Sequence, residues 1–594
     1  MNNFLKNINF PIIGRWFILG TIVGIIAGLG AILFFILLQG TSYFFIDYLT
    51  GLRIGETGGE PSLFGHATTE FKRWMLFLIP TIGGLISGFL VYKFAPEAEG
   101  HGTDAAIEAI HFKNGYIRWQ VPIVKTIASA ITIGTGGSGG REGPIAQIGA
   151  GFASFLGRKL NITDREKRIL TAAGMGAGVG AIFRSPLAGA IFAAEVLYSS
   201  SDLEAEVLLP STITSIIAYS IFCSIFGWDS LFLTPDFRFT NPLELFPYTI
   251  LGFACALFGY IYVNIFYKTH QTFKNLKISN YMKPVIGGFL TGIIIFLVPQ
   301  ALGGGYSNIE KAMHGELTIG FLFILIFAKI FSTSFTIGSG GSAGIFGPSM
   351  VIGASVGGFM GLVLEKIFPA VVSNPGAYAL VGMAGFFAGI ANTPLSTIIM
   401  VSEMTGNYHL LVPAMWVSSL SFLILKNTTI YKSQVRARSD SPIHKGEFFI
   451  QILQEIKVGE IMRKDPLVIR ADMHFKEILE FIPTTKHNSF PVITENNKLV
   501  GVLRFEEIRE FVFEEGLEDI VVAGEICDTE TPIITPDVTL ADAIETIGFK
   551  NIELLPVVNN KDEKKLEGII TRRDIITIYN KEMMKQKKLE ETLF

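Results

Sequence analysis

Long apolar runs separated by short polar segments fill the chain as far as residue 431. A helix needs about 20 apolar residues to cross the ~30 Å hydrocarbon layer of a bilayer. Most of the runs approach this length and contain almost no charged residues, so they predict membrane-spanning helices. The predicted spans are 17–38, 74–91, 208–226, 247–266, 284–298, 319–335 and 410–425.

Between these runs lie glycine-rich apolar stretches that are too short or too interrupted to be simple spans. The chain contains 63 glycines in 594 residues. Irregular backbone is tolerated at membrane depth only where protein or a water-filled cavity surrounds it. The pattern therefore predicts broken and re-entrant helices of the kind that transporters use, with close helix packing explaining part of the glycine content.

Two segments of the chain, 125–157 and 329–361, repeat one pattern and align without a gap. They share a leading lysine, a T-I-G step, a G-G-S cluster, a G-P step and an I-G-A that follows. Each copy places a glycine-rich turn and a proline between apolar stretches, which predicts a helix that begins inside the hydrophobic layer. Two such helix starts can point their free N–H groups at one anion.

The first copy carries the sequence G-R-E-G-P at its predicted helix start. The backbone N–H groups of Arg141, Glu142 and Gly143 lack helical partners there and, with the helix dipole, attract an anion without trapping it. The second copy, G-I-F-G at 344–347, has no charged side chain and predicts a second cradle of backbone amides. The Glu142 carboxylate can occupy the site as a tethered anion, and its alternative role is an ion pair with Arg141.

These motifs resemble those of the CLC family of chloride channels and transporters. G-R-E-G-P at 140–144 and G-x-F-x-P at 344–348 match two anion motifs of the family, and G-H-G-T-D at 100–104 stands in place of its G-S-G-I-P. Tyr431 lies where the family has the tyrosine that faces the central anion. Since the motifs occur in the family's order, the resemblance covers the membrane part almost completely.

The second half of an inverted repeat is also visible. S-P-L at 185–187, followed by Glu195, mirrors T-P-L at 393–395, followed by Glu403. The resemblance implies an α-helical multi-pass membrane protein of the CLC fold, with an inverted repeat and broken or re-entrant helices. It also implies a homodimer in the cell membrane (plasma or inner), one anion path per subunit, bound chloride, no required cofactor and Glu142 as the gate. The expected anion-binding residues are His101, Gly140, Arg141, Gly143, Ile345, Phe346, Gly347 and Tyr431.

One departure from the family concerns proton coupling. Exchangers of the family usually carry an acid one residue after the position of Glu195, and this chain has Val196 there. Glu195 is a poor substitute, because one helical step turns a side chain by about 100°. We therefore expect a passive anion channel, gated by voltage or pH and not strictly coupled to protons. The alternative is a proton/chloride exchanger whose relay uses water or another residue such as His101.

Two further departures lie in the G-H-G-T-D motif. His101 replaces the serine that would face the central anion. Its imidazole can donate a hydrogen bond, add charge in acid, or only fill the space while bonded to a carbonyl or to Asp104. Asp104 is expected to cap a helix start, because a carboxylate turned toward the path would repel anions. These changes leave bicarbonate and nitrate open as substrates beside chloride.

The lysines that head the two copies, Lys125 and Lys329, are expected to be buried or snorkelling cations that raise the positive potential of the path. Pairing with a carbonyl is the structural alternative. Glu403 is expected to support a helix or the dimer rather than to carry protons. A cation transporter would need more acids at membrane depth than Glu142, Glu195 and Glu403, so that class of transporter is disfavoured.

The composition changes after residue 431, where a basic and then polar segment leads into two similar halves. Each half predicts a helix, a short strand, a helix, two strands and a helix, and the pair resembles CBS (cystathionine-β-synthase type) domains. The expected parts are a membrane domain at 1–432, a linker at 433–455, α/β CBS modules at 456–520 and 521–580, and a tail at 581–594. The basic residues after the last span place the CBS pair in the cytoplasm.

Many CBS pairs bind adenine nucleotides through a Thr and an Asp in the pattern T-x-x-D. Thr571 and Asp574 fit this pattern in the second half, whereas the first half has Arg504 and Glu507. A short carboxylate suits a ribose diol, so we expect at most one site, for ATP, ADP or AMP. The alternatives are that Asp574 caps a helix or faces solvent, and that the pair only mediates dimer contacts.

Composition agrees with this division. Hydrophobic residues make up 49% and charged residues 17% of the chain, against about 25% charged in a soluble domain, and the mean hydropathy is +0.46. Cys223, Cys255 and Cys527 are scattered, which indicates neither a disulfide framework nor a metal site. The sequence contains no recognisable set of nucleophile, base and oxyanion donors, so we do not expect an enzyme. The net charge of −4 says little about partners, and no nucleic-acid partner is expected.

The N-terminal sequence MNNFLKNINF lacks the small-residue cleavage site of a signal peptide. We therefore expect the first apolar run to be retained as a membrane span.

Overall fold

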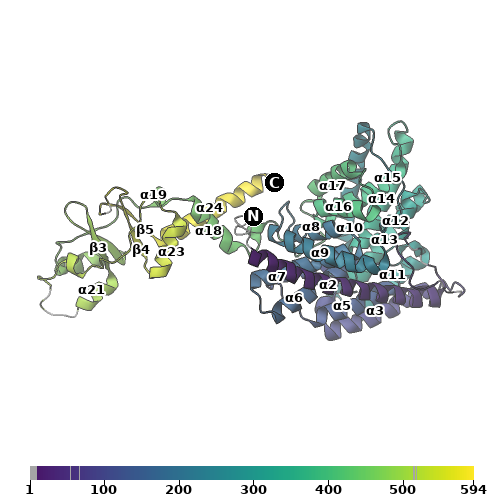
Figure 1. Cartoon of the computed structure of the whole chain (residues 1–594), viewed down its shortest axis with the longest axis horizontal. Helices are drawn as coiled ribbons and strands as arrows, with labels where there is room; N and C mark the ends of the chain where they lie inside the picture. Colours follow the sequence, from purple (N-terminus) through teal and green to yellow (C-terminus); the bar gives the residue numbers. More distant parts are fainter. Residues whose placement is uncertain are drawn as a thin grey trace. The chain divides into compact units, whose positions relative to one another are not determined.

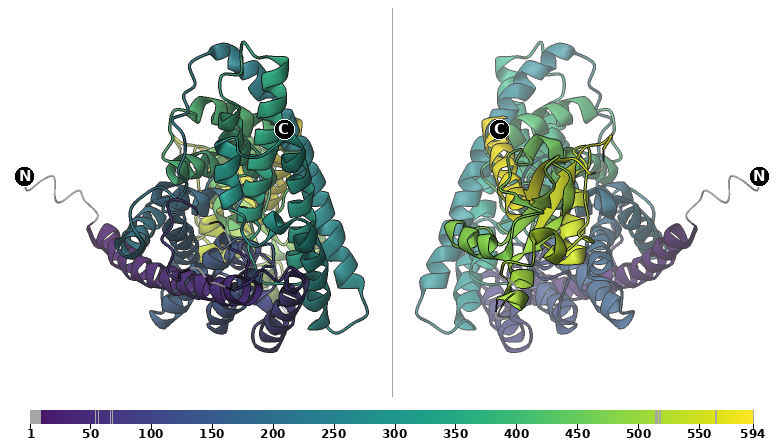
Figure 2. Two further views of the ribbon diagram at one scale, coloured as in Figure 1. Left: turned by 90° about the vertical axis from the view of Figure 1, so that its right-hand side faces the viewer. Right: turned by 90° about the vertical axis from the view of Figure 1, so that its left-hand side faces the viewer.

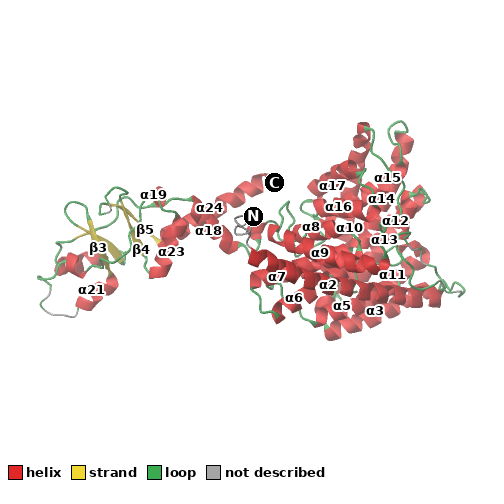
Figure 3. Cartoon of the chain, viewed as in Figure 1, coloured by secondary structure: helices red, strands yellow, loops and turns green. Residues whose placement is uncertain are grey.

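The computed structural model describes residues 10–593, except 54, 56, 66, 68, 513–515, 517 and 563. Two compact units divide the chain, Met1–Pro442 and Ile443–Phe594. In Figure 3 the described part of the first unit is built from helices and loops, and the strands lie in the second unit. The first nine residues, which belong to the N-terminal sequence without a cleavage site, lie outside the described residues.

The helices of the first unit form two series that follow the same order. The first series is α3 (Met75–Phe94), η2 (Pro96–Ala98), α4 (Thr103–Phe112), α5 (Gln120–Gly134), α6 (Glu142–Lys159), α7 (Asp164–Ile182), α8 (Pro186–Glu195) and α9 (Ala205–Phe226). The second is α11 (Met282–Leu297), η4 (Pro299–Ala301), α12 (Ser307–Met313), α13 (Ile319–Gly338), α14 (Phe346–Ile367), α15 (Pro375–Ala391), α16 (Pro394–Thr405) and α17 (Leu411–Leu425). A long helix precedes each series: α2 (Phe10–Ser42), continued by η1 (Tyr43–Tyr48), and α10 (Leu245–Asn275), which follows η3 (Pro242–Glu244).

One pair of counterpart helices, α3 and α11, packs together in opposite directions. A Cβ on Gly84 of α3 would overlap the carbonyl of Pro284 in α11, and a Cβ on Gly288 of α11 would overlap the carbonyl of Pro80 in α3. Because the residue numbers rise along one helix as they fall along the other, the two helices are antiparallel. The expected inverted repeat is therefore present, and glycine is what lets its halves approach so closely.

Six described helical segments are long and apolar enough to cross a membrane, namely Gly14–Tyr48, Met75–Phe94, Ala205–Phe226, Pro242–Asn275, Ile319–Gly338 and Phe346–Ile367. Two expected spans are corrected: 284–298 and 410–425 form α11 and α17, with 16 and 15 residues. Both are too short to span alone, and they pack against longer helices of the unit. The span Phe346–Ile367 was not predicted from the sequence, because its glycine-rich start interrupts the apolar run.

The long helix α2 packs against α5, α6, α7 and α9 along one side of the unit (Figure 1, Figure 2). The other long helix, α10, packs against α13, α14, α15 and α17. Between them, buried side chains of both series form one large apolar cluster. It includes Ile145 and Ile148 of α6 and Met350 and Ile352 of α14. This packing fixes the starts of α6 and α14 in the interior of the unit.

The second unit is an α/β structure with two small sheets. One sheet has the order β1-β2-β3 and the other pairs β4 with β5. Their strands are β1 (Ile469–Arg470), β2 (Ser489–Ile493), β3 (Leu499–Arg504), β4 (Leu554–Val558) and β5 (Leu566–Thr571). The helices are α18 (Lys445–Glu455), α19 (Val458–Ile461), α20 (Phe475–Phe481), η6 (Ile482–Thr484), α21 (Phe505–Phe511), α22 (Ala523–Ile526), α23 (Leu540–Lys550) and α24 (Arg572–Leu593).

The two halves of this unit repeat each other in register as well as in order. In the first, β2 and β3 pair antiparallel with Ser489 opposite Arg504; in the second, β4 and β5 pair with Leu554 opposite Thr571. The short first strand of the second half is reduced to one parallel bridge at Ile534. The expected α/β repeat is present.

The first helix of each half of this unit packs in the apolar core of the other half. Val458 of α19 lies in an apolar core with Leu540 and Leu555 of the second half. Ala523 of α22 lies in the other core with Phe490 of the first half. The sequence boundaries 456–520 and 521–580 therefore do not bound two separate cores.

Two expected segments next to the modules also differ from the structure. The linker 433–455 is divided at the boundary of the two units, and Leu453 of α18 belongs to an apolar core of the second unit. The tail 581–594 continues the helix α24 as far as Leu593, and residue 594 lies outside the described residues. An amphipathic sequence explains the helical linker, since its apolar side packs on the modules.

Candidate functional site

The starts of α6 and α14 meet through the glycine-rich turns that precede them. Gly140 donates its N–H to the carbonyl of Gly344 at 2.6 Å, and Gly344 returns the bond at 2.7 Å. The N–H groups in the first turn of each helix have no acceptor within that helix. The two copies of the repeat thus face each other as expected, with one correction. The N–H of Gly140 already has a partner, so it is not free to bind an anion.

The carboxylate of Glu142 lies between these helix starts and is buried, with 3% of the residue exposed. Its Oε2 accepts a hydrogen bond from the N–H of Gly347 at 3.1 Å, and its Oε1 accepts one from the hydroxyl of Tyr306. A Cβ on Gly140 would overlap Oε2 and lie 2.7 Å from the nitrogen of Gly347. Only glycine at position 140 leaves room for the carboxylate.

Arg141 does not pair with Glu142, which was the alternative role for that acid. Its guanidinium Nη1 instead lies 2.5 Å from Oε1 of Glu60, in the loop between α2 and α3. The Arg141 side chain is therefore turned toward this loop and away from Glu142. The sequence placed Glu142 and Gly347 at the site but did not predict the bond between them, and it did not indicate Tyr306.

Tyr306 is a site residue that the motifs did not indicate. It directly precedes α12, in the segment P-Q-A-L-G-G-G-Y-S at 299–307. That segment is the counterpart of P-E-A-E-G-H-G-T-D at 96–104 in the first series. Extending the repeat upstream to these segments would have pointed to Tyr306 as a counterpart of Thr103.

His101 and Tyr431 lie together near the start of α6. Their ring centroids are 5.5 Å apart, and His101 is 8% exposed. A Cβ on Gly143 would overlap the carbonyl of His101, which places this pair directly beside the start of α6. Among the described residues, Nδ1 of His101 is buried without a hydrogen-bond partner. That nitrogen is therefore not held by Asp104 or by a carbonyl.

Asp104 does not cap a helix start, contrary to expectation. The N-cap of α4 is Gly102, whose φ of 85° allows the sharp turn there. The Asp104 carboxylate accepts the N–H of Ser433 at 2.8 Å. It thereby anchors the segment that carries Tyr431.

Ile345 and Phe346 lie where the sequence placed them, at the start of α14. The ring of Phe346 packs between Phe183 and Phe387, with centroid distances of 4.8 and 4.3 Å. This packing fixes the backbone of the second helix start.

Lys125 and Lys329 are fully buried and have equivalent partners. The Lys125 ammonium donates to the carbonyls of Ala98 and Gly100 at 3.0 and 2.7 Å. Lys329 donates to the carbonyls of Ala301 and Gly303 at 3.0 and 2.6 Å. Neither lysine snorkels, and carbonyl pairing, the structural alternative, is what the structure contains. Each lysine holds the segment that precedes its half's short helix.

Glu195 and Glu403 hold the starts of each other's helices. Glu195 accepts from the N–H of Leu395 and of Ser396 at the start of α16, at 2.9 and 2.8 Å. Glu403 of α16 accepts from the hydroxyl of Ser185 and the N–H of Ala188 at the start of α8, at 2.5 and 3.1 Å. Val196, the next residue after Glu195, is fully buried. These acids serve as reciprocal helix caps.

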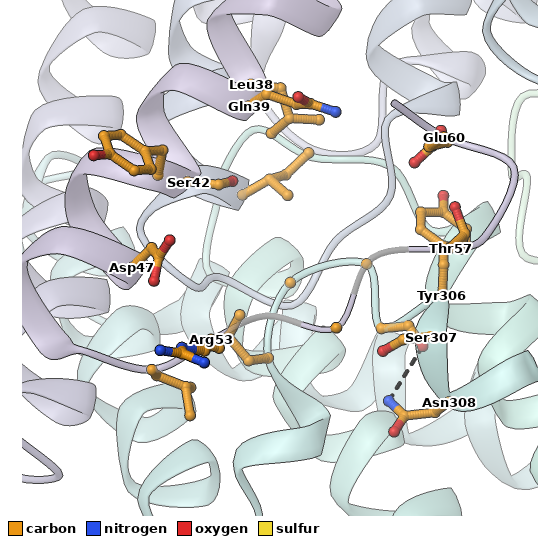
Figure 4. A pocket seen from close by; sticks show the side chains of 18 of the residues that line it. Leu38, Gln39, Ser42, Asp47, Arg53, Thr57, Glu60, Tyr306, Ser307 and Asn308 are labelled. Atoms are coloured by element: carbon orange, nitrogen blue, oxygen red, sulfur yellow. Dashed lines mark hydrogen bonds between the residues drawn. The ribbon is translucent and has the colours of Figure 1, made fainter. Parts of the chain in front are cut away.

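Two cavities lie on either side of this group. The Arg141 cavity, of 330 Å³, is lined by Arg141, Tyr306 and Glu60; Figure 4 shows Glu60 and Tyr306 on one side of it, and Asp47 and Arg53 on the other. The His101 cavity, of 660 Å³, is lined by His101, Gly102 and Asp104.

The cavities open near opposite ends of α3. Leu302 lines the Arg141 cavity and packs with Leu76, in the first turn of α3. Tyr92, near the end of α3, lines the His101 cavity. A helix of 20 residues is about 30 Å long, which matches the thickness of a bilayer core. Glu142 bonds to Tyr306, which lines the Arg141 cavity, and its neighbour Gly143 contacts the carbonyl of His101, which lines the other cavity. Glu142 therefore lies between residues that line the two cavities.

The second unit brings Thr571 and Asp574 together at the start of α24. Asp574 Oδ2 accepts from the Thr571 hydroxyl at 2.6 Å, and Oδ1 accepts from Arg463 Nη2 at 2.6 Å. Partial burial raises the pKa of Asp574, but the bonds from Arg463 and Thr571 outweigh it and hold that pKa below its usual range. Both oxygens of the expected ribose-binding acid are thus engaged.

An ion pair also lies at the equivalent place in the other half, with the positions of the basic and acidic residues exchanged. Arg504 donates to Asp528 at 2.7 Å and also pairs with Glu507, three residues on. Arg463 and Asp528 begin the two halves, and Asp574 and Arg504 end them. Each ion pair therefore ties the start of one half to the end of the other.

Comparison with known proteins agrees with this architecture. Residues 83–426 match the family described as voltage gated chloride channel. Residues 458–514 and 523–581 each match the CBS domain.

Similar curated proteins include an H(+)/Cl(−) exchange transporter, ClcA, of Vibrio cholerae serotype O1, 30% identical over 64% of this chain and 86% of that protein. Chloride channel protein CLC-f of Arabidopsis thaliana is 27% identical over 87% of this chain and 75% of its own length.

Solved structures share the fold. A slow cyanobacterial Cl−/H+ antiporter aligns with a TM-score of 0.60 at 24% identity, over 70% of this chain and 94% of its own. A eukaryotic CLC transporter aligns with a TM-score of 0.57 at 19% identity, over 94% of this chain and 98% of its own.

Proposed function

Because this chain belongs to the voltage gated chloride channel family, we propose that it conducts chloride through a membrane along a path that Glu142 closes. One observation carries this proposal: the Glu142 carboxylate bridges the starts of α6 and α14, between the two cavities. An ionised carboxylate at this place is a tethered anion held by the same donors that would hold chloride. Chloride passes when the carboxylate is protonated or displaced.

The donors along the path are backbone amides with partial charges. The backbone N–H groups in the first turns of α6 and α14, including those of Gly143, Phe346 and Gly347, have no acceptor within their own helices. The N–H of Gly347 holds the Glu142 carboxylate. His101 and Tyr431 would receive the anion on the side of the His101 cavity. Dipoles attract an anion in a low-dielectric layer without the trapping that a bare cation would cause.

We propose passive conduction rather than strict proton coupling. The support is the buried apolar Val196 at the place where exchangers of the family usually have an acid, next to a Glu195 whose oxygens cap α16. The exchange transporter among the relatives makes proton/chloride exchange the second candidate. In that case His101, with its unpartnered Nδ1 in the described structure, is the group best placed to carry the proton.

Reconstituted full-length protein in liposomes separates these candidates. With a chloride gradient alone, passive conduction gives the chloride equilibrium potential at zero current. An imposed pH gradient leaves that potential unchanged and drives no uphill chloride movement. A shift of the potential with the pH gradient, or uphill chloride uptake, would establish exchange instead. Replacing chloride by nitrate or bicarbonate in the same assay identifies the preferred anion.

The remaining parts of the proposal are a homodimer in the cell membrane, with the CBS unit in the cytoplasm and an adenine nucleotide as its regulator. Arg463 donates a hydrogen bond to Asp574, the acid that would bind the ribose of the nucleotide. We expect Arg463→Ala to strengthen ATP binding in calorimetric titration of the full chain, and Asp574→Ala to abolish it. Weaker ATP binding in Arg463→Ala would mean that Arg463 contacts the phosphates.

A further inference from the structure

We propose that Tyr306 latches the gate: its hydroxyl, bonded to Glu142, holds the carboxylate in the blocking position, and the Arg141–Glu60 ion pair holds Tyr306. This inference rests on the proposed function, because it assigns a second residue to the closed state of the same path. Tyr306 is a positioning residue, since it acts on the anion through Glu142.

The carboxylate of Glu142 is held at both oxygens by two different elements. Oε2 accepts the backbone N–H of Gly347 at the start of α14, and Oε1 accepts the hydroxyl of Tyr306 at the start of α12. A carboxylate held at one oxygen can swing about that bond. Held at both, it must break a charge-assisted hydrogen bond to each element before it leaves. Tyr306 therefore adds a barrier to opening that the helix dipole alone does not provide.

The structure makes specific room for the tyrosine. A Cβ on Gly304 would lie 2.6 Å from the ring of Tyr306, and a Cβ on Gly347 would overlap its hydroxyl. Gly347 thus has two tasks, donating its N–H to Glu142 and leaving space for the hydroxyl that bonds the other oxygen. Such close fitting fixes the position of the hydroxyl relative to the carboxylate.

Arg141 fixes the ring from another side. Its guanidinium carbon lies 5.1 Å from the centroid of the Tyr306 ring, a cation–π distance. The same guanidinium is paired with Glu60, and its side chain is 4% exposed. Figure 4 shows Glu60 and Tyr306 on the same side of the cavity. Arg141 cannot turn toward Glu142 while this ion pair persists.

The loop that carries Glu60 is itself anchored to the rest of the unit. The carbonyl of Gly59 accepts a hydrogen bond from Arg184 Nη1 at 2.8 Å. The N–H of Gly58 donates to Oε1 of Glu310, on α12, at 3.0 Å. The Gly58–Glu310 bond thus ties the loop to α12, and the Gly59–Arg184 bond ties it to the segment between α7 and α8. Displacement of this loop would loosen the latch without touching Glu142.

The counterpart of Tyr306 in the first half is Thr103, and this difference makes the two mouths of the path unequal. In the inverted repeat the segment of Thr103 lines the His101 cavity, and the segment of Tyr306 lines the Arg141 cavity. Among the described residues, the side-chain hydroxyl that bonds the Glu142 carboxylate therefore comes from the side of the Arg141 cavity.

Chloride efflux from liposomes at fixed pH tests the latch. Loss of a hydrogen bond to a charged group corresponds to about a tenfold change, so Tyr306→Phe should raise efflux about tenfold. In a Glu142→Ala background, which has no carboxylate to hold, Tyr306→Phe should have no effect. Glu60→Gln should raise efflux by a smaller factor, again only when Glu142 is present.

Tyr378→Phe is the matched control. It removes a buried hydroxyl which, among the described residues, has no hydrogen-bond partner, and efflux should stay at the wild-type rate. Unchanged efflux in Tyr306→Phe, or an equal increase in the Glu142→Ala background, overturns the latch. If Glu142→Ala itself fails to raise efflux, the proposed function is wrong, and that failure is visible before Tyr306 is considered.

Discussion

Oε2 of Glu142, in the first half of the inverted repeat, accepts a hydrogen bond from the N–H of Gly347, in the second half, at 3.1 Å. The two residues are 205 positions apart and meet because each stands at the start of a counterpart helix. The acid of one half thereby fills the anion cradle of the other. In the proposed function, the closed state of the path is therefore a contact between the two repeats.

Gly140→Ala should open the path without removing the acid. The new Cβ would overlap Oε2 of Glu142, so the carboxylate must leave its place between the helix starts. We expect chloride efflux to rise about tenfold, since a hydrogen bond to a charged group is lost. Gly320→Ala in α13, where a Cβ meets nothing within 4 Å, is the control. Efflux that stays low in Gly140→Ala would show that the carboxylate does not block the path.

His101→Ser should change which anions pass. The substitution removes the imidazole beside Tyr431 and supplies a hydroxyl donor. One hydrogen bond of about 0.5–1.5 kcal/mol corresponds to a change of roughly 2- to 10-fold. We expect the nitrate-to-chloride permeability ratio to shift by that factor in reversal-potential measurements. An unchanged ratio together with an unchanged pH response would show that His101 only fills space.

Glu195→Gln should lower stability without changing proton coupling. The substitution weakens the cap on α16, and loss of a helix cap costs about 0.5–2 kcal/mol. We expect the unfolding temperature in detergent to fall by a few degrees, and Glu403→Gln to behave in the same way. The response of the reversal potential to a pH gradient should remain that of the wild type. A changed response in Glu195→Gln would identify this acid as a proton carrier.

Asp574 should make the CBS unit sensitive to acid. Its folded-state pKa is held low, so its stabilising contribution is present above the unfolded pKa of about 3.9. That contribution is lost as the pH falls through the folded pKa. Asp574→Asn removes the ion pair with Arg463 and should destabilise the unit at pH 7, and this effect should shrink as the pH falls through the folded-state pKa of Asp574.

Thiol labelling measures that difference. Cys527 is buried in the CBS unit, and its labelling during heating reports when this unit opens. At pH 7 the thiol of Asp574→Asn should react at a lower temperature than that of the wild type. Equal labelling temperatures at pH 7 would show that the ion pair does not stabilise the unit.

The sequence alone was enough to predict the features that depend on residues close together in the chain. The helix starts at Glu142 and Phe346 follow from glycines and a proline in fixed positions. The strand pairs of the CBS unit follow from short apolar segments around turns. The repeat also predicted two helix starts inside the hydrophobic layer, because similar sequences form similar local structures. Their free N–H groups could then point at one anion.

Contacts between distant segments escaped prediction. The bond from Tyr306 to Glu142 joins residues 164 positions apart, and no local pattern marks a tyrosine as its donor. The partner of Arg141, Glu60, lies in a polar loop without periodicity. The exchange of the first helices between the two halves of the CBS unit could not be predicted from the sequence either. The two halves are so similar that either helix could pack on either core.

The central claim is that the Glu142 carboxylate blocks the path, and chloride efflux from liposomes as a function of pH tests it most directly. Glu142→Gln keeps the shape of the side chain and removes its charge. Glu365→Gln is the matched control, because it lies on α14 at about 27 Å from Gly347, by 1.5 Å per residue. The account predicts that efflux through Glu142→Gln is high and independent of pH, while the wild type and Glu365→Gln close as the pH rises. Efflux through Glu142→Gln that still falls at high pH would contradict it.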